Sequence, residues 1–143
     1  MSTLDRAGIE ALLPHREPFL MVDRVVALEP GVSGTGEKDV TEALCAGHFP
    51  GHPVMPGVLM AEALAQMAAI VALSVKPDAA GEPVYLVGMD KFRFRKPVTP
   101  GDVLTLEVKL TEDRRRMVTF SATASVGGTR VANGTLLATA PGA

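Results

Sequence analysis

The apolar and polar positions in the second half of this chain alternate with a period of two. Leucine and valine alternate with threonine, glutamate and lysine over residues 104–110, and a similar alternation recurs over residues 118–126. Because successive side chains of a strand point to opposite faces, this pattern predicts strands with one buried face. Gly127 and Gly128 fit a two-residue hairpin turn, and residues 129–138 return as the next strand.

The central segment has a different pattern, because its apolar residues would cover every side of a helix. Residues 58–75 contain only three polar side chains, those of Glu62, Gln66 and Ser74. We expect the helix to begin at Pro56 or Gly57 and to end near Val75, since proline suits a first helical turn. The segment approaches the length of a membrane span. A carboxylate at membrane depth is costly, however, so we expect the buried helix of a folded domain.

Shorter patterns complete the predicted order of elements. Residues 5–13 are predicted to form an amphipathic helix that ends before proline, and further strands are predicted over residues 19–28, 34–40 and 84–95. A half-buried antiparallel sheet needs a cover over its apolar face, and the long helix is the available cover. The sequence therefore predicts one α+β domain over residues 1–143, an antiparallel sheet wrapped around one long buried helix.

Composition narrows the possible functions. The 143 residues carry a net charge of -2, with no tryptophan and one tyrosine, which argues against a nucleic-acid surface. The single cysteine, Cys45, has no partner for an internal disulfide, and the N-terminus does not resemble a secretory signal. We therefore expect a cytoplasmic domain with no membrane span and no nucleic-acid partner.

Glu62 is the one carboxylate within the apolar helix. Gln66 follows four residues later, so the two side chains share one helix face and can hydrogen-bond. A carboxyl group buried among apolar side chains is costly unless it is paired, and it holds its proton more readily than in water. These properties suit a general acid.

His48 precedes this helix, in a loop that three prolines stiffen. Neutral histidine is the usual general base near neutral pH. Gly57 lies at the helix start, where a backbone N–H without an intrahelical partner can bind a developing oxyanion. A base, an acid and this donor are the parts needed to remove a proton beside a thioester carbonyl and expel a β-hydroxyl. Spacing alone does not distinguish this catalytic interpretation from a structural one, in which His48 is a hydrogen-bonded loop residue and Glu62 lies at a subunit interface.

Three longer segments indicate the function more specifically than the spacing of single residues does. LLPHREPFLMVDRV (12–25), GHFPGHPVMPGVLMAEALAQ (47–66) and LVGMDKFRFRKPVTPGD (86–102) together resemble the Z-type β-hydroxyacyl–acyl carrier protein dehydratases of bacterial type II fatty-acid synthesis. The resemblance covers nearly the whole chain. It implies a hot-dog fold and a hydro-lyase that converts (3R)-hydroxyacyl–acyl carrier protein to the trans-2-enoyl form without cofactor or metal. It also implies a homodimer with two active sites across its interface, and a trimer of such dimers.

The resemblance assigns roles to individual residues. His48 matches the catalytic histidine, and the carbonyl of Val54 matches the acceptor that orients its ring. Glu62, contributed by the partner subunit, matches the catalytic glutamate, and Gln66 matches the glutamine beside it. The N–H of Gly57 matches the donor to the thioester oxygen. The related A-type enzymes carry aspartate at the acid position, so a glutamate there favours dehydration without isomerisation.

One departure from the family pattern concerns the predicted substrate tunnel. Leu44 and Cys45 stand where the family often has an aromatic pair, which leaves the shape of the tunnel mouth and the acyl chain length open. We interpret Cys45 as an apolar wall residue rather than a nucleophile activated by His48. A metal cluster of Cys45, His48, His52 and His15 is not expected, because its spacing matches no common zinc pattern. We expect His52 to be exposed, and His15 and Arg16 to cap and dock the N-terminal segment.

Positive charge gathers near the end of the strand predicted over residues 84–95. Three cations alternate with two phenylalanines, a fourth follows, and an arginine triplet stands further along: Lys91, Arg93, Arg95, Lys96, and Arg114 to Arg116. A solvated strand face is the simple interpretation. Because acyl carrier proteins are acidic, the resemblance favours a docking surface for this partner.

Other function classes remain open on sequence grounds. A hot-dog acyl thioesterase would use the same helix start to activate water, and a dehydratase could serve a polyketide-type pathway. A non-catalytic hot-dog subunit would only bind acyl chains. Neither a thioesterase nor a non-catalytic subunit would require His48 and Glu62 to occur together with Gln66.

Overall fold

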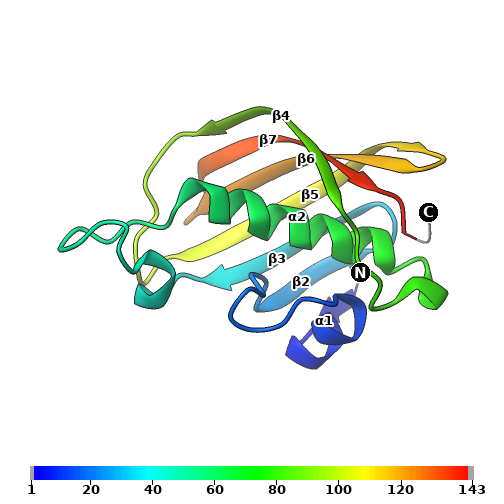
Figure 1. Ribbon diagram of the computed structural model, residues 1–143, viewed down its shortest axis with the longest axis horizontal. Coiled ribbons are helices and arrows are strands. Elements are labelled where there is room, and N and C mark those ends of the chain that lie inside the picture. Colours follow the sequence, from blue (N-terminus) through cyan, green and yellow to red (C-terminus); the bar gives the residue numbers. More distant parts are fainter. Residues whose placement is uncertain (1, 142–143) are drawn as a thin grey trace.

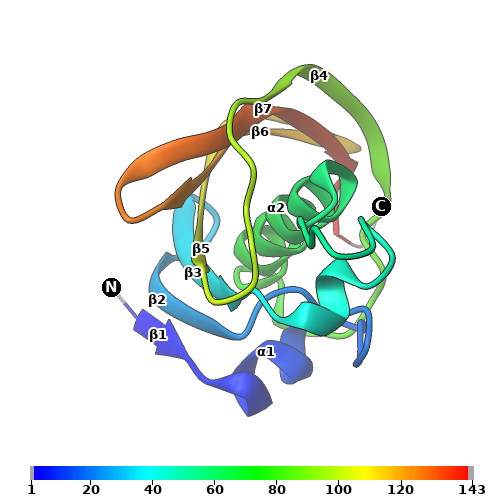
Figure 2. The ribbon, with the colours of Figure 1, turned by 90° about the vertical axis from the view of Figure 1, so that its left-hand side faces the viewer.

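The computed structural model describes residues 2–141, and it shows one antiparallel sheet that curls around a central helix (Figures 1 and 2). The seven strands follow the order β1-β2-β3-β5-β6-β7-β4 across the sheet. Their bounds are β1 Ser2–Leu4, β2 Arg24–Glu29, β3 Ser33–Asp39, β4 Leu86–Phe94, β5 Val103–Arg114, β6 Met117–Val126 and β7 Thr129–Thr139. The predicted α+β architecture, a hot-dog fold, is therefore confirmed.

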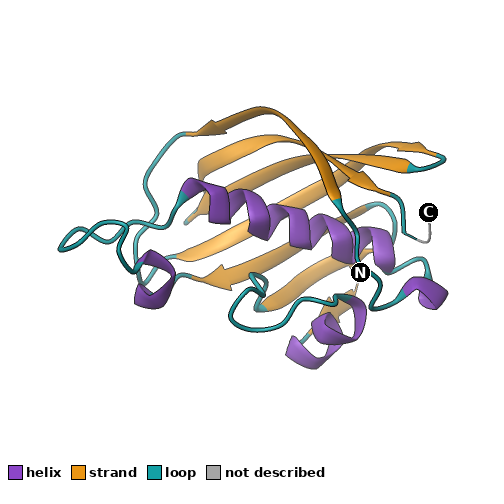
Figure 3. Cartoon of the chain, in the orientation of Figure 1, coloured by secondary structure: helices purple, strands orange, loops and turns teal. Residues whose placement is uncertain are grey.

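Helix α2, Gly57–Leu73, lies along the concave face of the sheet (Figure 3). Twelve of its residues are buried, and its less covered positions include Val58, which is 73% exposed, and Glu62. Glycines of β3 let the helix approach the sheet closely. A Cβ atom at Gly34 would lie 2.6 Å from Met67 Cε, and one at Gly36 would lie 2.7 Å from Met67 Sδ.

The predicted strand over residues 19–28 is wrong in its first half, because β2 begins only at Arg24. The backbone groups of Phe19 and Met21 are bonded to a helix side chain instead of a neighbouring strand. Gln66 accepts a hydrogen bond from the N–H of Met21 at 2.7 Å and donates one to the carbonyl of Phe19 at 2.9 Å. The local apolar pattern was correct about burial and incorrect about pairing, since Leu20, Met21 and Val22 are buried without being in the sheet.

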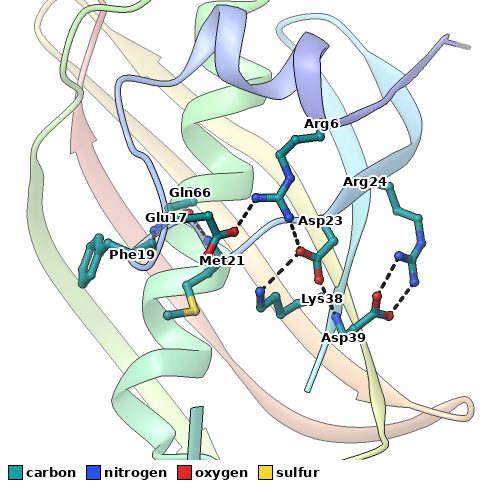
Figure 4. Close-up of polar contacts among 9 residues, drawn as sticks. All are labelled: Arg6, Glu17, Phe19, Met21, Asp23, Arg24, Lys38, Asp39 and Gln66. Carbon is teal, nitrogen blue, oxygen red and sulfur yellow. Dashed lines mark hydrogen bonds and ion pairs between the residues drawn. The ribbon is translucent and has the colours of Figure 1, made fainter. Parts of the chain in front are cut away.

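The N-terminal segment is fixed by charged side chains around Asp23 (Figure 4). Arg6 of helix α1, Arg6–Leu12, donates to Asp23 Oδ1, and the nearly buried Lys38 donates to the same oxygen at 3.3 Å. The N–H of Asp39 donates to Asp23 Oδ2 at 2.7 Å. On the outer side of this group, hydrogen bonds from Arg24 hold the pKa of Asp39 below its usual range.

Strand β4 also departs from the predicted alternation. Its register against β7 shifts between Asp90 and Arg93, and Lys91 has a positive φ of 55°, so a β-bulge interrupts the strand. Further short elements were not predicted: β1 and the 3-10 helices η1, Glu42–Cys45, and η2, Pro77–Ala79. The hairpin turn is as predicted, because Gly127 and Gly128 both have positive φ between β6 and β7.

Candidate active site

His48 lies in the loop that projects beyond the start of α2, after η1 (Figure 1). Its backbone N–H donates to Cys45 O at 2.9 Å, and its carbonyl accepts from Val54 N–H at 2.7 Å. Its imidazole Nδ1 lies 2.9 Å from Val54 O. Because a carbonyl only accepts, this contact requires hydrogen on Nδ1, and it leaves Nε2 of the neutral ring free to accept a proton.

A cavity beside this imidazole brings together several of the predicted residues. Its wall includes His48, Val54 and Gly57, with Phe94 at the end of β4. Gly57 is the first residue of α2, so its N–H belongs to the donors that have no intrahelical acceptor. A larger residue at this position would crowd Phe94, because a Cβ atom there would lie 3.0 Å from the Phe94 ring.

Glu62 and Gln66 lie on the wall of a second cavity. Gln66 is almost fully buried, and its Nε2 donates to Glu62 Oε2 at 2.9 Å. The bonds of Gln66 to Phe19 and Met21 fix the orientation of its amide (Figure 4). The carboxylate is less buried than the apolar helix suggested, because the Glu62 side chain is 24% exposed in the single chain.

No residue of the described chain lines both cavities, so the single chain does not assemble the predicted base and acid in one site. The first cavity, of about 250 Å³, holds His48, and the second, of about 180 Å³, holds Glu62. Both are smaller than the roughly 300–1,000 Å³ that is typical of small-molecule sites.

His15 is a residue of the second cavity that the sequence did not connect to it. Its Nε2 lies 3.9 Å from Glu62 Oε2. Arg16, by contrast, caps α1 as expected, because its guanidinium donates to the carbonyls of Leu13 and Glu10. The family-like segment that contains His15 and Phe19 was the only sequence signal for this position. It could not place His15 beside Glu62, because one sequence gives no distance between this segment and the helix.

The predicted cations fall into two separate groups. Arg95 and Lys96 line the His48 cavity, and Arg93 lies exposed beside them. Arg95 also donates to Asn133 Oδ1 at 2.8 Å. The triplet at residues 114–116 lies in the β5–β6 hairpin, at the opposite end of the sheet from the His48 loop, so it does not extend this surface (Figure 1).

Cys45 lies in the hydrophobic core rather than in the wall of either cavity. Burial, with a smaller effect of Glu42, raises the pKa of its thiol, which disfavours the thiolate that a nucleophile requires. His52 is exposed, as predicted. Within residues 2–141, no three histidine, cysteine or acidic side chains are arranged as metal ligands, and no helix is long and apolar enough to cross a membrane.

Structural comparisons support the fold. A dehydratase heterocomplex, ApeI:P from Xenorhabdus doucetiae, superposes with a TM-score of 0.79 at 21% identity, covering 93% of this chain and 90% of that chain. A hypothetical thioesterase with coenzyme A from Streptococcus pneumoniae superposes with a TM-score of 0.65 at 13% identity, covering 80% and 82%. At these identities the similarity establishes a shared fold and does not separate the two activities.

Sequence comparisons distinguish the dehydratases from the thioesterases as relatives of this chain. The FabA-like domain model matches residues 13–135. The 3-hydroxyacyl-(acyl-carrier-protein) dehydratase FabZ of Herpetosiphon aurantiacus is 53% identical over 131 residues, which cover 90% of this chain and 92% of that protein. FabZ of Myxococcus xanthus is 51% identical over 139 residues, covering 95% and 91%. The chain therefore belongs to the FabA-like domain family and, within it, to the FabZ-type dehydratases.

Proposed function

We propose that this protein is a hydro-lyase of fatty-acid synthesis that converts (3R)-hydroxyacyl–acyl carrier protein to trans-2-enoyl–acyl carrier protein. The identity to FabZ dehydratases over nine tenths of the chain supports this reaction and substrate class. It favours dehydration over thioester hydrolysis. The composition and the single cysteine support a cytoplasmic location.

His48 is the proposed base. The observation that carries this role is the contact between Nδ1 and Val54 O, which directs the free Nε2 lone pair away from the backbone. Nε2 removes the proton from the carbon beside the thioester carbonyl. The electron pair moves toward the carbonyl oxygen, and the N–H of Gly57, at the positive end of α2, stabilises the enolate charge.

Glu62 is the proposed acid. Its Oε2 accepts a hydrogen bond from Gln66, whose amide is fixed by two backbone partners, so Oε1 is the oxygen on which a proton is held. As the enolate re-forms the carbonyl, the carbon–oxygen bond at the β position breaks and the hydroxyl takes the Glu62 proton. The products are a carbon–carbon double bond and water. In hydration the two side chains exchange roles.

A complete site in this proposal needs two copies of the chain. His48 and Glu62 line different cavities of one copy, and each cavity is small for an acyl thioester. The exposed Val58 and the half-buried Glu62 lie on the side of α2 that the sheet leaves least covered. We propose a homodimer in which this side faces the other copy and His48 meets the Glu62 of that copy. A trimer of such dimers is the proposed larger assembly.

The partner that delivers the substrate is acyl carrier protein. Arg95 and Lys96 line the His48 cavity, and Lys91 and Arg93 are exposed on the same end of β4. An acidic carrier approaching this cationic surface would bring its acyl group to the cavity that holds the base.

A single assay tests the reaction class. The purified protein is incubated with 3-hydroxybutyryl–acyl carrier protein, and both the enoyl product and the free carrier thiol are measured. We expect reversible formation of enoyl thioester without thiol release. Thiol release would instead identify a thioesterase, and the absence of either product would identify a non-catalytic subunit.

A further inference from the structure

His15 is held beside the carboxyl group of Glu62 by the segment between α1 and β2. Its Nε2 lies 3.9 Å from Glu62 Oε2, and its ring stacks on Phe19 with the ring planes 13° apart. The backbone carbonyl of Phe19 accepts from Gln66, the same amide that donates to Glu62. One buried glutamine therefore fixes both the carboxylate and the segment that carries the imidazole.

The other ring nitrogen of His15 is unusual. Within residues 2–141, His15 Nδ1 is the one buried side-chain polar atom that has no hydrogen-bond partner. A hydrogen on this nitrogen would be a buried donor without an acceptor, which is costly. The neutral tautomer with its hydrogen on Nε2 avoids this cost, and it directs the only N–H of the ring to the side that faces Glu62.

We infer that His15 is a positioning residue for the dehydration: its Nε2–H donates to Oε2 of Glu62 when that carboxyl group has lost its proton. The inference rests on the proposed role of Glu62 as the acid. A rotation of the ring that shortens the 3.9 Å separation to about 3 Å would complete the hydrogen bond. Gln66 and His15 would then both stabilise Oε2, while Oε1 remains free to face the departing hydroxyl.

The effect is specific to one protonation state. A neutral N–H donor binds a carboxylate more strongly than a carboxylic acid, so it lowers the barrier to proton release by Glu62. The ionisable groups that line this cavity are His15, Glu62 and Tyr85. Arg16 is directed toward α1, where it contacts Glu10, so it does not replace the imidazole.

The test compares three substitutions of His15. Phenylalanine keeps an aromatic ring to stack on Phe19 but has no donor. Glutamine places an amide N–H near the position of Nε2, and asparagine places one near the position of Nδ1, away from Glu62. We expect His15→Phe and His15→Asn to lower kcat by about ten- to a hundredfold, the usual effect of one lost hydrogen bond to a charged group. We expect KM to change little and His15→Gln to recover most of kcat.

The pH profile supplies a second readout. Loss of a donor to the carboxylate makes Glu62 hold its proton more tightly, so the alkaline limb of kcat should move to higher pH in His15→Phe and should return in His15→Gln. The inference is overturned if His15→Phe keeps the wild-type kcat and alkaline limb. It is also overturned if the Phe, Asn and Gln variants lose activity equally and in proportion to their loss of thermal stability.

A double variant separates this inference from the proposed function. If Glu62 is the acid, Glu62→Gln alone is nearly inactive, and adding His15→Phe causes no further loss because no carboxylate remains to stabilise. A fully active Glu62→Gln enzyme would overturn the proposed role of Glu62. An inactive Glu62→Gln enzyme that loses a further ten- to a hundredfold with His15→Phe would overturn only the inference about His15.

Discussion

Each of the two proposed catalytic groups is held by a partner that fixes which of its atoms is free. Val54 O occupies Nδ1 of His48, and Gln66 Nε2 occupies Oε2 of Glu62. We expect His48→Ala and Glu62→Gln each to lower kcat by about 10²–10⁴, the typical contribution of general acid or base catalysis. Glu62→Gln keeps the shape of the side chain but has no carboxyl proton to donate, so circular dichroism should show an unchanged fold.

The pH dependence follows from the same two roles. Dehydration requires neutral His48 and protonated Glu62, so kcat/KM should fall both toward acid and toward alkaline pH. Glu62→Asp should keep partial activity, because it retains an acid one methylene further from the substrate. A folded Glu62→Gln enzyme with near-normal turnover would contradict the mechanism and support an interface role for Glu62.

Cys45 offers an independent test at the scale of one residue. Its side chain is 1% exposed, and burial raises the pKa of the thiol, so little thiolate forms at neutral pH. We expect Cys45→Ala to keep wild-type kcat and the native thiol to react with a disulfide reagent far more slowly than the thiol in denaturant. Loss of kcat in a stably folded Cys45→Ala protein would revive the cysteine as a nucleophile.

At the scale of secondary-structure elements, the β4–β7 pair supports one wall of the His48 cavity. Gly134 of β7 lies under the Phe92 ring of β4, and a Cβ atom there would be 2.6 Å from ring Cγ. Phe92 packs near Phe94, with ring centroids 5.9 Å apart, and Phe94 lies against Gly57 at the start of α2. We therefore expect a larger side chain at Gly134 to displace these rings and, through them, the N–H that is proposed to bind the thioester oxygen.

We expect Gly134→Ala to lower the free energy of unfolding by about 1–3 kcal/mol, as overpacking does, and to lower kcat as well. Gly88→Ala on the paired strand is a matched control, because its Cβ atom would make an ordinary contact of 3.8 Å with Leu137. It should change the free energy of unfolding by less than about 1 kcal/mol. Urea denaturation measures the free energy of unfolding of both variants, and equal losses in Gly134→Ala and Gly88→Ala would contradict the packing argument.

How far the sequence determines these elements depends on the range of the interactions. The alternation over residues 118–126 and the paired glycines after it are local signals, and both elements appear as predicted. The segment around Met21 and the bulge at Lys91 were missed, because each depends on a partner distant in the sequence: Gln66 for the first and strand β7 for the second. The contact between His15 and Glu62 is of the same kind, since the two residues are 47 positions apart in the chain.

At the scale of the whole molecule, the cationic groups at the two ends of the sheet allow a controlled test of carrier binding. We expect the double variant Lys91→Glu, Arg93→Glu to raise KM for an acyl carrier protein substrate, because these exposed cations of β4 lie outside the wall of the His48 cavity and their reversal opposes the acidic carrier. Turnover of a small thioester that lacks the carrier should be unchanged. The rise in KM should shrink at high ionic strength.

The matched control is Arg114→Glu, Arg116→Glu, which makes the same change of net charge in the β5–β6 hairpin. It should leave KM for both substrates near the wild-type value. Equal effects of the two double variants would mean that net charge alone steers the carrier, and equal losses on carrier and small thioester would mean that residues 91 and 93 are structural.

The assembly of the active site gives the last prediction. One chain places His48 and Glu62 on different cavities, so a variant that lacks either group is expected to be inactive as a homodimer. In a hybrid of His48→Ala and Glu62→Gln chains, one of the two sites combines an intact His48 from one copy with an intact Glu62 from the other. Random pairing of equal amounts should therefore restore about a quarter of wild-type activity, since half of the dimers are hybrids with one intact site each.

Co-expression with two different affinity tags, followed by purification on both, isolates the hybrid. Hybrids of His48→Ala with the double variant His48→Ala, Glu62→Gln contain no intact site and should stay inactive. A purified hybrid that is as inactive as its parents would show that His48 and Glu62 of the same copy act together.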